Sequence, residues 1–106
     1  MHARVTMVQS QRGQQDELVQ IYQESVVPAA ERQAGFRGAL LLSDPYSDKG
    51  ISITLWESEA AMVAGETSGY YQEQIRKFGT LFAAPPNREH YEVSVQVDAP
   101  QQRGER

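Results

Sequence analysis

The side chains best suited to acid–base chemistry are His90 and Glu92, two residues apart near the end of the chain. A histidine ionises near neutral pH, so it could accept a proton during a reaction. A carboxylate on a face of small residues is either a base or one half of an ion pair, for which Arg4 is the expected partner. His90 also fits a surface histidine beside a loop. His90 and Glu92 are therefore candidate catalytic residues, with these structural roles as the alternatives.

A second group of residues could bind a ligand without reacting with it. Trp56, the only tryptophan, could stack on a planar ring or pack the mouth of a barrel with its indole N–H bonded to a carbonyl. Thr54 precedes it on the same strand face, and Thr6 belongs to the same face of the first strand. Tyr70 could turn its hydroxyl into a cavity, with a core or surface role as the alternative. Arg37 could bind an anionic substrate, although an exposed arginine on an edge strand is the alternative.

Composition removes several classes of chemistry. The chain has no cysteine, which excludes disulfides, thiolate nucleophiles and cysteine-ligated metals. No phosphate-binding loop, dinucleotide fingerprint, nucleophile elbow or paired-histidine motif occurs, so no metal and no cofactor is expected. The Lys and Arg residues are scattered and the net charge is -4, which argues against nucleic acid as a partner. The apolar runs are too short to span a membrane and no signal peptide is recognisable, so a cytoplasmic protein is expected.

Hydrophobic periodicity predicts four strands and two helical regions in this chain of 106 residues. The strands are expected over residues 3–9, 36–43, 51–56 and 88–97. The first helical region starts at residue 14 and is interrupted by Pro28, which either kinks the helix or opens a second one. The second region starts after Ser58, a plausible N-cap, and is broken near two glycines. One domain over residues 1–98 is expected, followed by a polar, disordered tail over residues 99–106.

The resulting order, βαββαβ, is typical of a ferredoxin-like α+β fold with a four-stranded antiparallel sheet. The expected strand order is 4-1-3-2, with both helices on one face. Ile51, Ile53 and Leu55 are expected to pack under these helices. The opposite face, with its small residues and Trp56, is then expected to meet a second copy of the chain and to leave a cavity where the residues are small.

The segment Gly35-Phe-Arg-Gly38 before a strand and hairpin, followed by Trp56-Glu-Ser-Glu-Ala60 at a strand–helix junction, resembles the antibiotic biosynthesis monooxygenase-like family. The resemblance spans roughly residues 3–97. It implies a homodimeric α/β barrel and a cofactor-independent monooxygenase, in which a small planar aromatic substrate itself donates electrons to O₂. The alternative is a non-catalytic, small-molecule-binding or stress-associated homodimer of the same fold.

The family also includes a haem-degrading branch, and the resemblance allows a comparison of its residues. That branch uses an asparagine in the first strand, the tryptophan, and a histidine about three helical turns later. Here Trp56 matches, but the asparagine position falls near Thr6 and the histidine position near Glu66. The comparison therefore predicts that this protein does not degrade haem.

Overall fold

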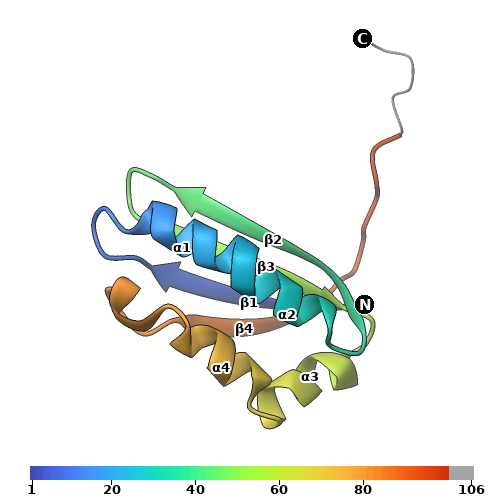
Figure 1. Ribbon diagram of the computed structural model, residues 1–106. Coiled ribbons are helices and arrows are strands. Elements are labelled where there is room, and N and C mark those ends of the chain that lie inside the picture. Colours follow the sequence, from blue (N-terminus) through green and yellow to red (C-terminus); the bar gives the residue numbers. More distant parts are fainter. Residues whose placement is uncertain (101–106) are drawn as a thin grey trace.

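The computed structural model describes residues 1–100 and contains one antiparallel sheet of four strands in the order β2-β3-β1-β4 (Figure 1). This order is the predicted 4-1-3-2 read from the other edge. Of the predicted tail, residues 101–106 lie outside the described residues. The strands are β1 (His2–Gln9), β2 (Phe36–Asp44), β3 (Lys49–Trp56) and β4 (Asn87–Glu92).

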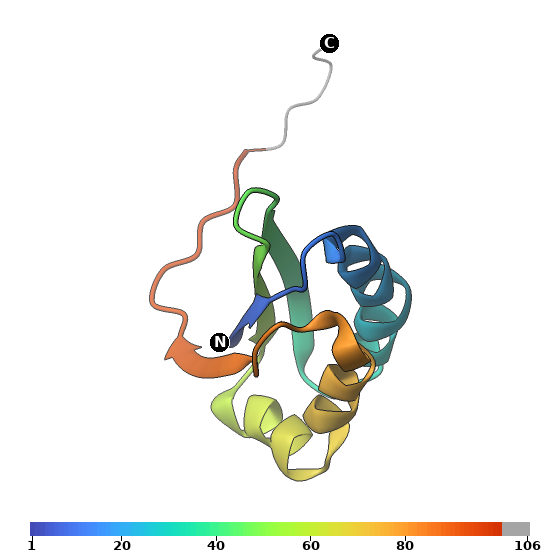
Figure 2. The ribbon, with the colours of Figure 1, turned by 90° about the vertical axis from the view of Figure 1, so that its left-hand side faces the viewer.

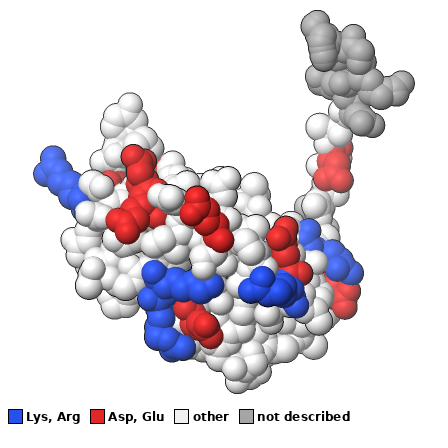
Figure 3. Space-filling view, viewed as in Figure 1, with Lys and Arg blue, Asp and Glu red and all other residues white. Residues whose placement is uncertain are grey.

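The helices lie on one face of the sheet, as Figures 1 and 2 show from two directions. None of those in residues 1–100 is long and apolar enough to cross a membrane. The charged side chains on the face seen in Figure 3 are of both signs and interspersed. The helical elements are α1 (Gln15–Ile21), the π-helix η1 (Tyr22–Val26), α2 (Val27–Glu31), α3 (Glu59–Thr67), α4 (Tyr70–Arg76) and the 3₁₀ turn η2 (Gly79–Leu81).

Pro28 explains the irregular first helix. It lies at the start of α2, directly after the π-helix η1. Proline has no N–H to donate to the preceding turn, and a π segment is one way for a helix to accommodate the missing hydrogen bond. The helix ends before Gly35, whose φ of 85° suits glycine.

The junction between β3 and α3 forms as the sequence predicts. Ser58 is the N-cap of α3, and its hydroxyl accepts a hydrogen bond from the Ala61 backbone N–H at 3.1 Å. A register shift between Phe36 and Gly38 interrupts the regular pairing of β2 with β3.

The sheet faces are the reverse of the prediction. The register aligns Leu40, Ile53 and Val5 in one row, and this face bears no helix. The next row, with Thr54 beside Arg4, points toward the helices. The alternation of residues along each strand correctly predicted which side chains share a face. The expectation that Ile51, Ile53 and Leu55 pack under the helices is wrong. The helices bring the large side chains of Tyr22 and Phe78, which lie opposite small residues of the sheet such as Ser52 and Thr54.

The core lies between this small-residue face and the helices. Leu18, Tyr22, Val26 and Phe78 form its main cluster. Trp56 and Met62 are the largest fully buried side chains. Strand β4 ends at Glu92, earlier than predicted, because after the bond from Val93 N to Met1 O at 2.9 Å the neighbouring strand has no more residues to pair.

Candidate functional site

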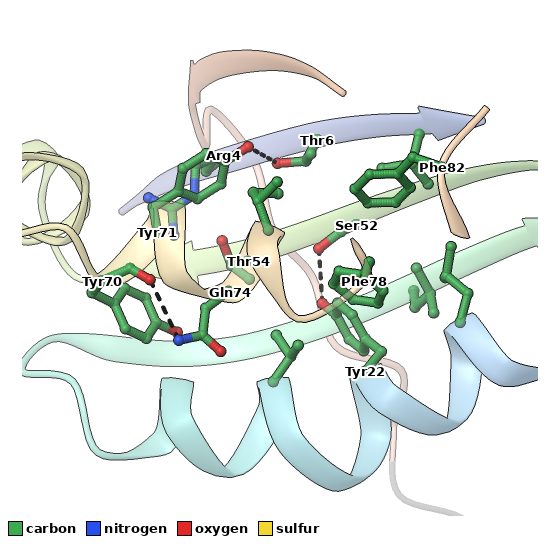
Figure 4. A pocket seen from close by; sticks show the side chains of 15 residues that line it. Arg4, Thr6, Tyr22, Ser52, Thr54, Tyr70, Tyr71, Gln74, Phe78 and Phe82 are labelled. Atoms are coloured by element: carbon green, nitrogen blue, oxygen red, sulfur yellow. Dashed lines mark hydrogen bonds between the residues drawn. The ribbon is translucent and has the colours of Figure 1, made fainter. Parts of the chain in front are cut away.

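A cavity lies between the sheet and the helices α1, η1 and α4 (Figure 4). Its volume is about 50 Å³. Its walls are mostly aromatic and aliphatic, with a few hydroxyls, one amide and one guanidinium. The lining residues are Arg4, Thr6, Val8, Leu18, Tyr22, Val26, Leu41, Ser52, Thr54, Tyr70, Tyr71, Gln74, Ile75, Phe78 and Phe82.

Two pairs of hydroxyls form hydrogen bonds across the cavity. Tyr22 of η1 shares a hydrogen bond of 2.8 Å with Ser52 of β3, and Tyr71 of α4 shares one of 3.2 Å with Thr6 of β1 (Figure 4). Burial raises the pKa of Tyr22 and also that of Tyr70. Both phenols are therefore neutral at physiological pH and can act as hydrogen-bonding groups toward a ligand.

Next to the cavity, Glu66 of α3 binds three basic side chains of the sheet. Its carboxylate lies 3.1 Å from Arg4 Nη1, 2.7 Å from His90 Nε2 and 3.6 Å from Arg88 Nη1. Arg4 is only 4% exposed and Glu66 9%. The neighbouring strands β1 and β4 place Arg4 opposite His90, which brings these side chains to the same end of the sheet. We call these four residues the Glu66 cluster.

Tyr71 connects the Glu66 cluster with the cavity. The guanidinium carbons of Arg4 and Arg88 lie 4.6 Å and 5.1 Å from the centre of its ring. Arg4 also lies 5.3 Å from the Trp56 ring. Cations at these distances are attracted to aromatic faces, so the cluster fixes the orientation of the tyrosine whose hydroxyl reaches the cavity wall.

The cavity offers aromatic and aliphatic surface with a few hydrogen-bonding groups. Among residues 1–100, no group of histidine and carboxylate side chains is arranged to hold a metal ion. Aromatic walls bind a ring through its area, and the few polar groups fix its orientation.

The profile of the family described as "Antibiotic biosynthesis monooxygenase" matches residues 1–77. The chain belongs to the antibiotic biosynthesis monooxygenase family. The resemblance inferred from the segments around Gly35 and Trp56 is thereby confirmed. No curated protein matches the sequence.

Solved structures with the same fold include a monooxygenase from Streptomyces coelicolor in complex with nanaomycin D (18% identity, 93% of this chain and 92% of that chain covered, TM-score 0.70). The cofactor-independent oxygenase SnoaB from Streptomyces nogalater is similar at 14% identity (92% and 97% covered, TM-score 0.74). The haem degrader MhuD from Mycobacterium tuberculosis is similar at 19% identity (92% and 100% covered, TM-score 0.72). At these identities the similarity shows the fold alone.

Three of the predicted ligand-binding residues line the cavity of this antibiotic biosynthesis monooxygenase family member, namely Thr6, Thr54 and Tyr70. Trp56 does not line it, which contradicts the expectation that the indole forms a pocket wall. The indole is 1% exposed, donates its N–H to Thr54 Oγ1 at 2.9 Å and meets the Phe36 ring edge-on. Trp56 packs the core behind the cavity, and a role for it in ligand binding stays a prediction.

The other three predicted site residues lie outside the cavity lining. Arg37 is exposed and pairs with Glu57 at 2.6 Å, as expected for an edge strand. Glu92 is exposed and aligned with His2, so the expected ion pair between Glu92 and Arg4 is wrong. Arg4 pairs with Glu66, which lies 62 positions away and shares no periodicity with it.

His90 lies at the edge of the cavity site without touching it. Its imidazole is 36% exposed and donates Nε2–H to the Glu66 carboxylate, the group that also holds Arg4. It therefore lies outside the cavity lining and is bound to Glu66, and its catalytic role stays a prediction.

Sequence reasoning missed several residues that form the cavity. Tyr22 and Tyr71 repeat with apolar residues at helical spacing, which is typical of core positions, and the sequence analysis did not single out Gln74. The available signal was the polar group carried by each of these otherwise core-facing positions. A buried polar group needs a partner, which marks it as a site candidate.

Proposed function

We propose that the protein is a cofactor-independent monooxygenase that binds a small planar aromatic between the sheet and the helices. The observation that carries the proposal is the cavity itself, whose aromatic walls bear paired hydroxyls and the Arg4 guanidinium. Membership of the antibiotic biosynthesis monooxygenase family supports the reaction class. The fold shared with SnoaB, a cofactor-independent oxygenase, supports the absence of a bound cofactor.

The cavity is small for an aromatic ligand. Its volume of about 50 Å³ is roughly a third of the 150 Å³ of an apolar cavity that takes up benzene. Entry of a single ring would therefore require lining side chains to move, and a ligand with several fused rings would require larger movements.

The proposed reaction draws all its electrons from the substrate. A dihydroxy-aromatic and O₂ give a hydroxyquinone and water, so one oxygen atom enters the ring and the other leaves as water. The substrate loses four electrons, which reduce both oxygen atoms of O₂. The protein would orient the ring against the cavity walls and hold its hydroxyls on the hydroxyl pairs.

Oxygen uptake tests this proposal. The purified protein is mixed with a panel of single-ring dihydroxy-aromatics in an oxygen-electrode cell, with catalase present to reveal peroxide from autoxidation. We expect one O₂ consumed per substrate without peroxide. Tyr71→Phe should lower kcat/KM by roughly 2- to 10-fold, the worth of one hydrogen bond, whereas the exposed Tyr46→Phe should not. Uptake no faster than in protein-free solution contradicts a monooxygenase.

A non-catalytic ligand-binding protein is the second candidate. One observation favours it: within residues 1–100, no carboxylate or imidazole belongs to the cavity lining, so a proton acceptor for the reaction is missing from the walls. Binding of an aromatic ring without oxygen uptake would support this second candidate.

We also propose that the protein forms a homodimer through the open face of its sheet. This face carries Leu40, Leu42 and Tyr91, which are 56%, 48% and 52% exposed in the single chain. The register places Val5, Met7, Ile51, Ile53 and Leu55 among them. Such a continuous apolar surface is typical of an interaction site, and a two-fold axis would cover it with its own copy.

Haem degradation is not part of the proposed function, although MhuD has the same fold. The histidine position of the haem-degrading branch falls near Glu66, and this carboxylate is held by Arg4, Arg88 and His90. A carboxylate bound in this way is not available as an iron ligand. The cytoplasm remains the proposed location, since a chain without cysteine needs no oxidising compartment.

A further inference from the structure

Gln74 is a polar side chain in an otherwise apolar part of the cavity wall. It belongs to α4, is 8% exposed, and lies one turn after Tyr70 and one turn before Phe78. All three residues line the cavity. A leucine or methionine would fill this position without burying an amide, so the glutamine calls for an explanation.

The orientation of the Gln74 amide follows from its one hydrogen bond. Nε2 donates to the Tyr70 carbonyl at 3.3 Å (Figure 4). A carbonyl can only accept, so the amide nitrogen and not the oxygen must face it. The amide oxygen is thereby directed elsewhere.

That oxygen, Oε1, is buried and has no hydrogen-bond partner among residues 1–100. Two hydroxyl pairs of the cavity bond to each other and not to Oε1, namely Tyr22 with Ser52 and Thr6 with Tyr71. Thr54 accepts the Trp56 indole N–H. A buried acceptor without a partner costs free energy, which a ligand could recover by donating to it.

We infer that Gln74 is the specificity-determining residue of the cavity and accepts a hydrogen bond from a hydroxyl or amino group on the aromatic ligand. An amide oxygen only accepts, so a ring that bears only acceptors or alkyl groups leaves Oε1 unpaired. The inference rests on the proposed function, because it assumes that the cavity takes an aromatic ring. It adds that the ring carries a donor.

A thermodynamic cycle tests the inference. Phenol and toluene have nearly the same shape and differ in one donor, and NMR titration gives the affinity of each for the protein. The ratio of the toluene Kd to the phenol Kd is compared between the wild type and Gln74→Met, which keeps the volume and removes the acceptor. We expect the ratio to fall by roughly 2- to 10-fold in the variant. Gln72→Met, at an exposed position of the same helix, should leave the ratio unchanged.

Urea unfolding separates this role from a structural one. Removing an unpaired buried acceptor should leave the unfolding midpoint of Gln74→Met equal to or above that of the wild type. A lower midpoint with an unchanged ratio would make Gln74 a structural residue and overturn the inference. If both compounds bind with the same ratio in wild type and variant, the inference fails and the proposed function stands. If neither compound binds, the aromatic ligand and the inference fail together.

Discussion

At the scale of the residue, Glu66 is the side chain that pairs with three basic groups, those of Arg4, Arg88 and His90. It is 9% exposed and faces Arg4, which is 4% exposed, so neither group can be solvated by water alone. Its contacts with Arg88 and His90 extend the pair to the edge strand. The cluster thus joins α3 to β1 and β4 at the end of the sheet where Tyr71 contacts Arg4 and Arg88.

We expect Glu66→Gln to lower the free energy of unfolding by about 2–4 kcal/mol, because it leaves the buried Arg4 charge without a counter-charge. Urea denaturation followed by Trp56 fluorescence measures the change. Glu57→Gln is the matched control, since the Glu57–Arg37 pair is 2.6 Å long but exposed and should cost at most about 1 kcal/mol. Equal losses of unfolding free energy in the two variants would contradict the claim that burial makes the Glu66–Arg4 pair the more important one.

Tyr22 makes the stability of the fold depend on pH in the alkaline range. Burial raises its pKa above the ordinary value of 10.0, so the folded protein retains a proton that the unfolded chain loses. The stabilisation is complete below pH 10 and is lost as the pH rises through the pKa of the folded state. Unfolding experiments from pH 8 upward should show stability falling above about pH 10.

The decline should be smaller in Tyr22→Phe, which has no phenol to ionise at this site. Some decline remains, because the pKa of Tyr70 is raised as well. Tyr46→Phe serves as the control, since Tyr46 is 97% exposed and its removal should leave the alkaline slope as in the wild type.

At the scale of the element, the turn from α2 into β2 is held against the start of α3. Gly35 has a φ of 85°, and its carbonyl accepts a hydrogen bond from the Glu57 N–H at 2.8 Å. A Cβ at this position would lie 2.6 Å from the Ala61 Cβ. The close approach of these two backbones places the first and second halves of the chain against each other.

Gly35→Ala should therefore destabilise the protein by about 2–4 kcal/mol, from backbone strain together with the clash. Gly13→Ala separates the two causes, because Gly13 has a φ of 80° with nothing within 4 Å of a new Cβ. That control should lose only about 1–2 kcal/mol in thermal or urea unfolding. If Gly35→Ala lowered the free energy of unfolding no more than Gly13→Ala, the contact with Ala61 would be relieved without an energetic cost.

At the scale of the whole molecule, one face of the sheet is covered by helices and the other is apolar and open in the single chain. Light scattering of a dimer should give twice the chain mass of 11.9 kDa. Ile53→Lys places a charge between Leu40 and Val5, at the middle of the open face, and should convert the dimer to a folded monomer. Tyr46→Lys, in an exposed loop, should remain dimeric. A wild-type mass of one chain at micromolar concentration would contradict the proposed homodimer.

The sequence alone was sufficient for the order of the elements, the strand order and the grouping of side chains on sheet faces. These properties follow from local periodicity and from chain connectivity, both of which are written in consecutive residues. Gly35, Pro28 and Ser58 likewise act through their own backbone or through neighbours within a few positions. Membership of the family could be recognised from the segments around Gly35 and Trp56 for the same reason.

Only the tertiary structure decided which sheet face the helices cover and which side chains meet there. Ile53 and Thr54 point to opposite faces whichever face the helices cover. Which face is covered depends on how the large helical residues fit over the small strand residues. The contacts between Arg4 and Glu66 and between Thr6 and Tyr71 join residues more than 60 positions apart. Such pairs leave no periodic trace, because their partners are selected by packing and charge in the folded chain and not by spacing along it.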